Sequence, residues 1–225
     1  MSTPPLPTLE ASVAAWPSLD VARRDHIVKT GGRLAELWEA SPVRIESNDN
    51  RCEEVIDALF PGNPLLCVAE SHVQFDTKRR EQWRGELAQM QLIVPSPMTS
   101  RTGRTQNGKL SAHALSNTGD RRFLVAAFST GSLDSDAALV LHLAIGAPLA
   151  LVGQNGDKGL DAWFLMEHYR PESQLQWFRH AVALGANAGM WPRSSWARLP
   201  EGTTEGGKKH AVSFLDPAPK VTKPL

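Results

Sequence analysis

The chain has few cysteines and no long apolar run, and both absences narrow its class. Its two cysteines, Cys52 and Cys67, form no CxxC pair and have no metal-site spacing, which favours free thiols in a reducing compartment. No apolar stretch approaches the roughly 20 residues of a membrane-spanning helix. Residues 1–7 lack the basic start and apolar core of a signal peptide. We therefore expect a cytoplasmic protein with no membrane partner.

Motifs of several common enzyme classes are missing as well. The sequence has no GxSxG nucleophile motif, and Glu167-His168-Tyr169 lacks the second, spaced histidine of an HExxH zinc site. The glycine-rich loop at 153–159 does not match the GxxxxGKS/T phosphate loop. Hydrolases with these motifs, zincins and P-loop enzymes are therefore not indicated.

A net charge is also lacking, because 24 Lys and Arg balance 24 Asp and Glu in 225 residues. Bulk charge thus gives no argument for nucleic-acid binding. The segment from Lys78 to Arg122 nevertheless holds nine basic residues against three acidic ones. Such a segment either attracts a phosphate backbone or forms a solvated surface with scattered charge. No aromatic stripe interleaves it, as one does in platforms for single strands.

What the chain does have is a strand, a helix, a strand and a glycine loop in that order. Phe123–Phe128 is a short apolar run bounded by charge and by Ser-Thr-Gly, which is typical of a buried strand. An apolar-periodic helix follows, capped within residues 134–136 and stopped by a Gly-x-Pro sequence. Residues 149–152 predict a second buried strand. The polar loop at 153–159 then lets the backbone approach a ligand closely.

The rest of the chain alternates helical and strand patterns between turns. A helix capped by Asp20 is weakened in its middle by Gly31-Gly32, which favours two pieces. The other expected elements are helices at 51–60, 78–87 and 171–184, and strands at 65–69, 91–94, 196–199 and 211–215. We expect the last two strands to pair across a glycine-rich hairpin loop. These elements predict an α+β fold in which helices cover a sheet.

Three further motifs stand in order after the glycine loop. They are Leu-Gly-Ala-Asn at 184–187, a Trp-x-Arg-Ser and Arg-x-Pro stretch at 191–200, and a Gly-Gly-Lys-Lys element at 206–209. With the preceding elements, over residues 121–217, they resemble archaeo-eukaryotic primases (primase-polymerases) of the branch found in plasmid, phage and other mobile-element replication proteins.

The resemblance implies a division of the chain. An RRM-like mixed sheet, the primase-polymerase core, is expected at 119–216, with an N-terminal α/β extension at 19–118 packed on it. By composition, residues 1–18 are expected to form a flexible arm, and residues 217–225 a tail rich in proline and lysine.

The chain departs from that family at the positions that carry its chemistry. The acid-x-Asp metal pair falls on Ala127 and Ser129, the loop histidine on Asp161, and a later aspartate on Asn187. Two-metal phosphoryl transfer needs hard oxygen ligands, mostly carboxylates. Ala127 offers no ligand, and Ser129 offers only a neutral hydroxyl. The comparison implies a primase-like domain whose catalytic centre is decayed or repurposed. No cofactor is expected, and Mg²⁺ or Mn²⁺ only if catalysis is retained.

The resemblance indicates seven candidate binding residues. The candidates for nucleotide binding are Lys158, Asp161 and Arg198, and those for nucleic-acid binding are Arg193, Ser194, Lys208 and Lys209. Each has an ordinary alternative. Lys158 and the two hairpin lysines also fit solvated turn residues, and the Asp161 carboxylate repels phosphate unless a cation intervenes. Arginine suits bidentate phosphate contacts, but Arg198 also fits a salt bridge.

We expect a catalytically compromised primase-like domain of a mobile-element or phage replication module. Its partner would be a nucleotide or single-stranded nucleic acid. One alternative is an active primase or polymerase that recruits Asp134, Asp136 or Asp161 as substitute acids, although the first two also fit helix caps. Another is a protein-interaction module that binds a replication protein, or another protein, through the former active-site face.

Overall fold

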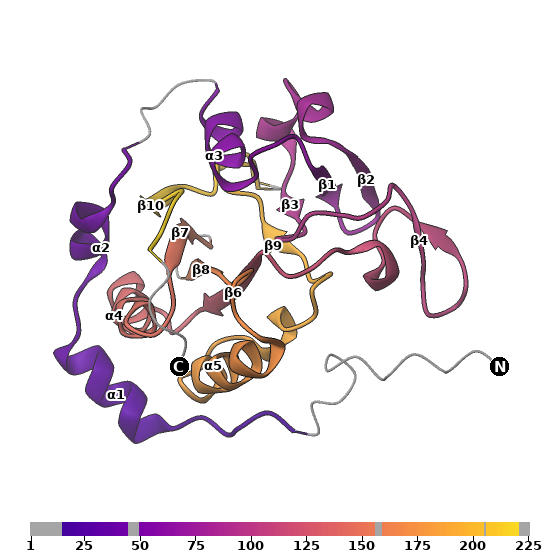
Figure 1. Ribbon diagram of the computed structural model, residues 1–225. Coiled ribbons are helices and arrows are strands. Elements are labelled where there is room, and N and C mark those ends of the chain that lie inside the picture. Colours follow the sequence, from indigo (N-terminus) through magenta and orange to yellow (C-terminus); the bar gives the residue numbers. More distant parts are fainter. Residues whose placement is uncertain (1–14, 45–49, 156–158, 205, 221–225) are drawn as a thin grey trace.

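The computed structural model describes residues 15–44, 50–155, 159–204 and 206–220. Over this range the fold is α+β, as the sequence predicts. Helices pack on two four-stranded sheets, and a short two-stranded hairpin lies outside them (Figure 1). Most of the predicted arm at 1–18 and the end of the predicted tail at 217–225 lie outside the described residues.

The central sheet contains the two strands that the strand-helix-strand pattern predicts, the strand predicted at 211–215, and one strand, at 160–165, that the sequence did not predict. Its strands are β6 (Phe123–Phe128), β7 (Leu149–Gln154), β8 (Leu160–Leu165) and β10 (Val212–Leu215), in the order β10-β7-β8-β6. The helix α4 (Leu133–Ala144) connects β6 to β7. It is capped by the side chain of Ser132, which accepts a hydrogen bond from the backbone of Ser135, so the cap stands two residues before the predicted one.

Both faces of the central sheet are covered, because side chains alternate between the faces along each strand. In β6, Leu124, Ala126 and Phe128 belong to the hydrophobic cluster that includes α4 and α5 (Pro171–Ala183). Phe123 and Val125 belong to the opposite cluster, which includes α3 (Arg51–Leu59). Figure 1 shows α4 and α5 beside the sheet, and α3 and the second sheet beyond it.

The second sheet, which we call the outer sheet, contains β1 (Leu65–Ser71), β2 (Gln74–Arg79), β3 (Leu92–Ile93) and β9 (Ala197–Arg198), in the order β2-β1-β3-β9. Its first three strands come from the front half of the chain. β9 comes from the segment predicted to belong to the primase-like core. The two halves of the chain therefore share this sheet.

The predicted helix at 78–87 is wrong. Lys78 and Arg79 end β2, where they pair with β1, and a single 3-10 turn follows at Arg80–Trp83. Gly85 has a φ of +80°, in the left-handed region that interrupts a helix. Pairing with β1 thus overrides a local sequence that favours a helix. A second 3-10 turn at Leu87–Gln89 leads into β3.

Two predictions about the sheets are also wrong. β9 does not pair with β10: it pairs with β3, and β10 pairs with β7. The loop between them contains the isolated bridge Thr203↔Lys209. Among the described residues every strand pairing is antiparallel, so the expected mixture of strand directions is not found. The crossover through α4 makes β6 and β7 parallel to each other, but β8 lies between them and pairs antiparallel with both.

The front helices confirm the predicted break. α1 (Val21–Thr30) is capped by Asp20, which accepts a hydrogen bond from the Arg23 backbone at 3.0 Å, and α2 (Leu34–Ala40) follows after two glycines. A Cβ on Gly31 would lie 2.9 Å from the Cβ of Ala138. The close approach of α1 to α4 therefore requires glycine here.

The remaining elements are short. β4 (Gly103–Arg104) and β5 (Leu110–Ser111) form the small hairpin, and 3-10 turns lie at Leu115–Asn117 and Ala188–Met190. The turn at 115–117 is fixed by the buried side chain of Asn117, which binds the backbone of Ser100, Ala112 and Ala114. The polar segment 96–118 is thus an ordered loop that packs on the outer sheet through Met98.

Candidate functional site

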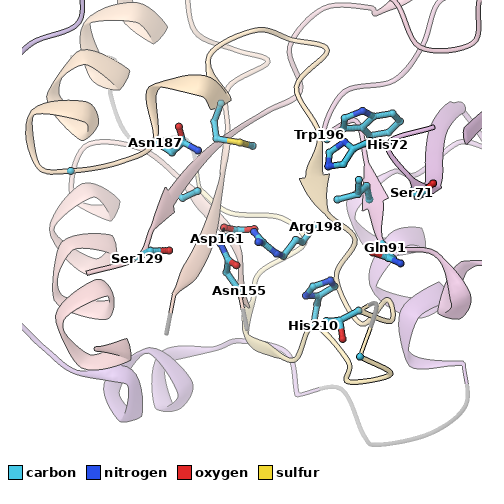
Figure 2. Close-up of a pocket in the computed structure, with 16 residues that line it drawn as sticks. Ser71, His72, Gln91, Ser129, Asn155, Asp161, Asn187, Trp196, Arg198 and His210 are labelled. Atoms are coloured by element: carbon cyan, nitrogen blue, oxygen red, sulfur yellow. Dashed lines mark hydrogen bonds and ion pairs between the residues drawn. The ribbon is translucent and has the colours of Figure 1, made fainter. Parts of the chain in front are cut away.

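A pocket with a volume of about 830 Å³ lies between the two sheets. The central sheet contributes residues of β6 and β8 to its wall, and the outer sheet contributes residues of β1, β3 and β9. Figure 2 shows Ser129 and Asn187 on one side of the pocket, Trp196 and Gln91 on the other, and Asp161 and Arg198 between them. The volume is within the usual range of small-molecule sites, roughly 300–1,000 Å³.

The four positions at which the sequence departs from the primase pattern meet in this pocket. Ala127, Ser129, Asp161 and Asn187 all line it. Ala127 pairs directly with Asp161 across β6 and β8, and the Asn187 backbone donates a hydrogen bond to the carbonyl of Ala127 at 2.9 Å. Residues separated by up to 60 positions in the sequence therefore occupy one wall of one cavity.

The centre of the pocket is an acid paired with an arginine. Asp161 is 4% exposed, and its Oδ2 lies 3.4 Å from Nη1 of Arg198 on the facing sheet. Its Oδ1 accepts a hydrogen bond from Nδ2 of Asn155 at 3.2 Å. Burial raises the pKa of Asp161, while the charge of Arg198 and the hydrogen bonds from Arg198 and Asn155 act to lower it.

Arg198 retains donors for another group. Its side chain is 40% exposed, and its only side-chain partner among the described residues is Asp161. A guanidinium carries several N–H donors in a fixed plane. The arginine therefore neutralises Asp161 and still presents N–H groups to the cavity.

His210 lies in the wall close to Arg198 (Figure 2). The residue is 6% exposed, and its Nδ1 is buried without a hydrogen-bond partner among the described residues. Burial and the positive charge of Arg198 lower the pKa of His210, against an opposing hydrogen bond with the backbone of Gln154. The imidazole is thus neutral near pH 7, and its buried Nδ1 has no hydrogen-bond partner among the described residues.

The predicted site residues separate into two groups. Asp161 and Arg198 come together in the pocket, whereas Lys158 lies outside the described residues. Arg193 donates a hydrogen bond to the carbonyl of Gly119 at 2.8 Å, and the carbonyl of Ser194 lies 2.6 Å from Nε2 of His113. Both of these residues therefore hold the chain in place, and neither lines the pocket.

The two lysines of the predicted hairpin tip are exposed. Thr203 pairs with Lys209 in an isolated bridge. The Lys208 carbonyl accepts a hydrogen bond from the Thr204 backbone, and the Lys208 N–H donates one to the Thr204 hydroxyl. Thr204 and Gly206 of the same loop line the pocket. The lysines thus stand on a loop at the pocket, although neither one lines the cavity itself.

The sequence did not indicate His210, Gln91 or Trp196 as site residues. His210 follows the lysine pair, and Gln91 precedes a short strand, so neither position has a local signal. Trp196 had one: it lies two residues before Arg198 at a predicted strand, and period-two alternation places both on the same face. Both residues do line the pocket.

The pocket has few possible metal ligands. Asp161 is the one acid in its described wall. Throughout the described ranges, no group of three or more His, Cys, Asp or Glu could hold a metal ion. Of the three proposed substitute acids, Asp161 lines the pocket and the other two are engaged elsewhere. Asp134 accepts a hydrogen bond from the Leu34 backbone at 3.1 Å, and Asp136 accepts two from Thr130.

The basic segment from 78 to 122 is mostly paired within the protein. Eight of its nine basic side chains contact an acid or a backbone carbonyl: Lys78, Arg79, Arg80, Arg84, Arg101, Arg104, Arg121 and Arg122. Five of them, Lys78, Arg80, Arg84, Arg101 and Arg122, are paired with an acid, which compensates their charge and reduces the attraction for phosphate. The arrangement favours an ordinary surface over a backbone-binding patch.

The two cysteines are buried, and both are free thiols. Burial is the main cause that raises the pKa of Cys52 to about 12 and that of Cys67 to about 11. Neither lines the pocket. In the part of the chain that is described, no helix has both the length and the apolar character to cross a membrane.

In comparisons with known proteins, no family model, no curated protein and no solved structure matches the chain.

Proposed function

We propose that this chain is a primase-polymerase-like domain of a mobile-element or phage replication module, which has lost catalysis and retains binding of nucleotide or single-stranded nucleic acid. The observation that carries the proposal is the convergence of Ala127, Ser129, Asp161 and Asn187 on one pocket with Arg198. Motif positions that a chance resemblance would scatter over the surface instead share a cavity of ligand size.

The chain order of the central sheet supports the same proposal. β6, α4, β7, β8 and α5 follow one another as the first five elements of a β-α-β-β-α-β unit do. The sixth position differs, because the strand after α5 joins the outer sheet and the last strand lies beside β7. This exchange brings Arg198 across the pocket from Asp161.

Loss of catalysis follows from the donors in the pocket. Phosphoryl transfer with two metal ions needs several oxygen ligands at one point. Asp161 is a single carboxylate, and Arg198 already neutralises it. The alternative of an active enzyme requires a second acid beside Asp161, and neither Asp134 nor Asp136 lines the pocket. Residues with hydrogen-bonding side chains remain, which suits binding without chemistry.

Titration of the protein with fluorescently labelled single-stranded DNA tests the proposal. It is carried out with and without a nucleoside triphosphate and Mg²⁺ or Mn²⁺, at low and at moderate salt. We expect binding that weakens as salt rises, is unchanged by chelation of metal, and yields no extended primer. Primer synthesis would overturn the loss of catalysis. Absence of binding would overturn the proposal and favour the protein-interaction module, whose complexes should survive high salt.

The double variant Asp161→Asn/Arg198→Gln tests whether the DNA binds in the pocket. It removes both charges together, so neither partner is left buried and unpaired. Affinity should fall to about one tenth or less, since charge-assisted contacts with phosphate contribute on the order of 1.5–3 kcal/mol. Arg101→Gln/Asp76→Asn is the matched control, because it removes an ion pair whose side chains are 65% and 46% exposed and likewise leaves the net charge unchanged. An equal loss in the control would assign the binding to the surface.

A further inference from the structure

We propose that the pocket holds one nucleotide unit of a single strand without a metal ion, with the base stacked on Trp196 and the phosphate at Arg198 and His210. This rests on the proposed function and specifies its ligand: a unit of a polynucleotide strand, and not a free nucleoside triphosphate with its metal.

The base site is a supported aromatic ring. The indole of Trp196 stacks on the imidazole of His113, with ring centroids 4.1 Å apart and an interplanar angle of 25°. Phe75 packs against both rings, at 5.7 Å from His113 and 5.8 Å from Trp196. The imidazole is itself fixed by its contact with the carbonyl of Ser194 at 2.6 Å. The indole is therefore held in one orientation before any ligand arrives.

Although Trp196 packs against His113 and Phe75, part of its indole ring remains exposed. It is only partly buried and it lines the pocket, whereas Trp83, Trp163, Trp177 and Trp191 are at most 4% exposed. Figure 2 shows it on the wall opposite Ser129 and Asn187. A fixed aromatic face beside hydrogen-bonding groups is how proteins bind unpaired bases, because every base has a π face.

The phosphate site follows from the strand geometry. Trp196 directly precedes β9 and Arg198 lies in it, two residues or roughly 7 Å further along the extended chain, and both line the pocket. One nucleotide can span that separation. At its phosphate end are the N–H groups of Arg198 that Asp161 does not use and the unpartnered, buried Nδ1 of His210.

The charge in the pocket decides between the two ligands. Arg198 and Asp161 cancel, His210 is neutral, and Asp161 is the one acid in the described wall. A triphosphate carries several negative charges and is normally bound with a metal ion held by carboxylates. A phosphodiester unit carries a single charge, and the N–H groups of Arg198 that Asp161 does not use can donate hydrogen bonds to it without a metal ion. The pocket therefore suits a strand.

The test compares two labelled strands of equal length, an oligothymidylate and the same strand with abasic sites, by fluorescence anisotropy in the presence of EDTA. The wild-type protein should bind the oligothymidylate more tightly, by roughly 5- to 100-fold if one base stacks on an aromatic ring. Trp196→Ala should remove this preference and leave the abasic strand bound as before. Trp196→Phe should keep most of it. Trp38→Ala is the control, since Trp38 is 47% exposed on α2 outside the pocket.

Each outcome decides a different point. If Trp196→Ala keeps the preference while the protein still binds DNA, the base site is overturned and the proposed function survives. If the wild-type protein binds neither strand, both proposals fail. If EDTA abolishes binding, or thymidine triphosphate with Mg²⁺ displaces the strand at equal concentration, the metal-free strand site is overturned. Thermal melting of each variant separates lost binding from lost folding, and Trp196→Phe keeps the test valid if the alanine variant unfolds.

Discussion

Replacing Asp161 with asparagine should strengthen the binding of a nucleic-acid strand. The substitution keeps the shape and a hydrogen-bond acceptor beside Asn155, but it removes the charge that faces Arg198 at 3.4 Å. At that distance two unit charges interact by about 5 kcal/mol for an effective dielectric constant of ~20. The Arg198 side chain is 40% exposed, so solvent screens the pair, and we discount the effect to about 1–1.5 kcal/mol. The released arginine should tighten binding about tenfold.

The assay is fluorescence anisotropy with a labelled single strand at about 50 and about 200 mM salt. The affinity of Asp161→Asn should exceed that of the wild type at both concentrations and should depend more steeply on salt. Asp134→Asn is the matched control: it changes the net charge equally, keeps an acceptor for the Leu34 backbone and lies outside the pocket. If both variants gain the same affinity, the effect is one of net charge, and the placement of the strand beside Asp161 is refuted.

The same variant has a second readout, and three other substitutions or reactions test the fold. Burial raises the pKa of Asp161 above its unfolded value, so the native state binds the proton more tightly than the unfolded state does. The stability of the wild type relative to Asp161→Asn, measured by urea unfolding, should therefore decline as the pH rises from about 4 through the raised pKa. Gly159→Ala should lose about 1–3 kcal/mol of stability to urea, since its Cβ would lie 2.6 Å from the carbonyl oxygen of Phe128; Gly206→Ala, whose nearest neighbour is 3.8 Å away, should lose little. Arg121→Met should lose about 2–4 kcal/mol, because it leaves the Gln174 amide and the Trp191 carbonyl without their buried donor; an unchanged unfolding midpoint would contradict this. Both cysteines, with pKa values raised to about 12 and about 11, should resist thiol reagents at about pH 8 until the protein unfolds, and rapid labelling of the native state would show that they are accessible.

Local signals were enough for many of the elements, because they act within one segment, although the strands at 74–79 and 160–165 were not predicted. The apolar run of β6, the cap at Asp20 and the glycine pair after α1 each depend on neighbours a few residues away. The segment 78–87 shows the limit. Its sequence favours a helix, but Lys78 and Arg79 gain more by pairing with β1, and that gain depends on residues 65–71, which no local pattern reveals.

For the site as well, the sequence indicated individual residues but not the contacts between distant segments. The resemblance indicated Asp161 and Arg198 separately, and the structure places them in one pocket from two different sheets. The pairing of β9 with β3 causes this, and the sequence favoured pairing with β10 instead. Arg193 was a reasonable phosphate ligand by its type, yet the carbonyl of Gly119 engages it. Which arginine is available to a ligand is decided by long-range contacts, and these appear only in the folded chain.

The most direct test of the account is to locate a bound strand by photo-crosslinking. A single strand carrying a photoreactive thymidine analogue is bound to the protein, irradiated and digested with trypsin, and the crosslinked peptides are identified by mass spectrometry. Cleavage after Arg193 and Arg198 releases Ser194–Arg198 as one short peptide that contains Trp196. The account predicts that this peptide carries the main crosslink and that Trp196→Ala removes it. Crosslinks concentrated in residues 78–122, with none in this peptide, would contradict it.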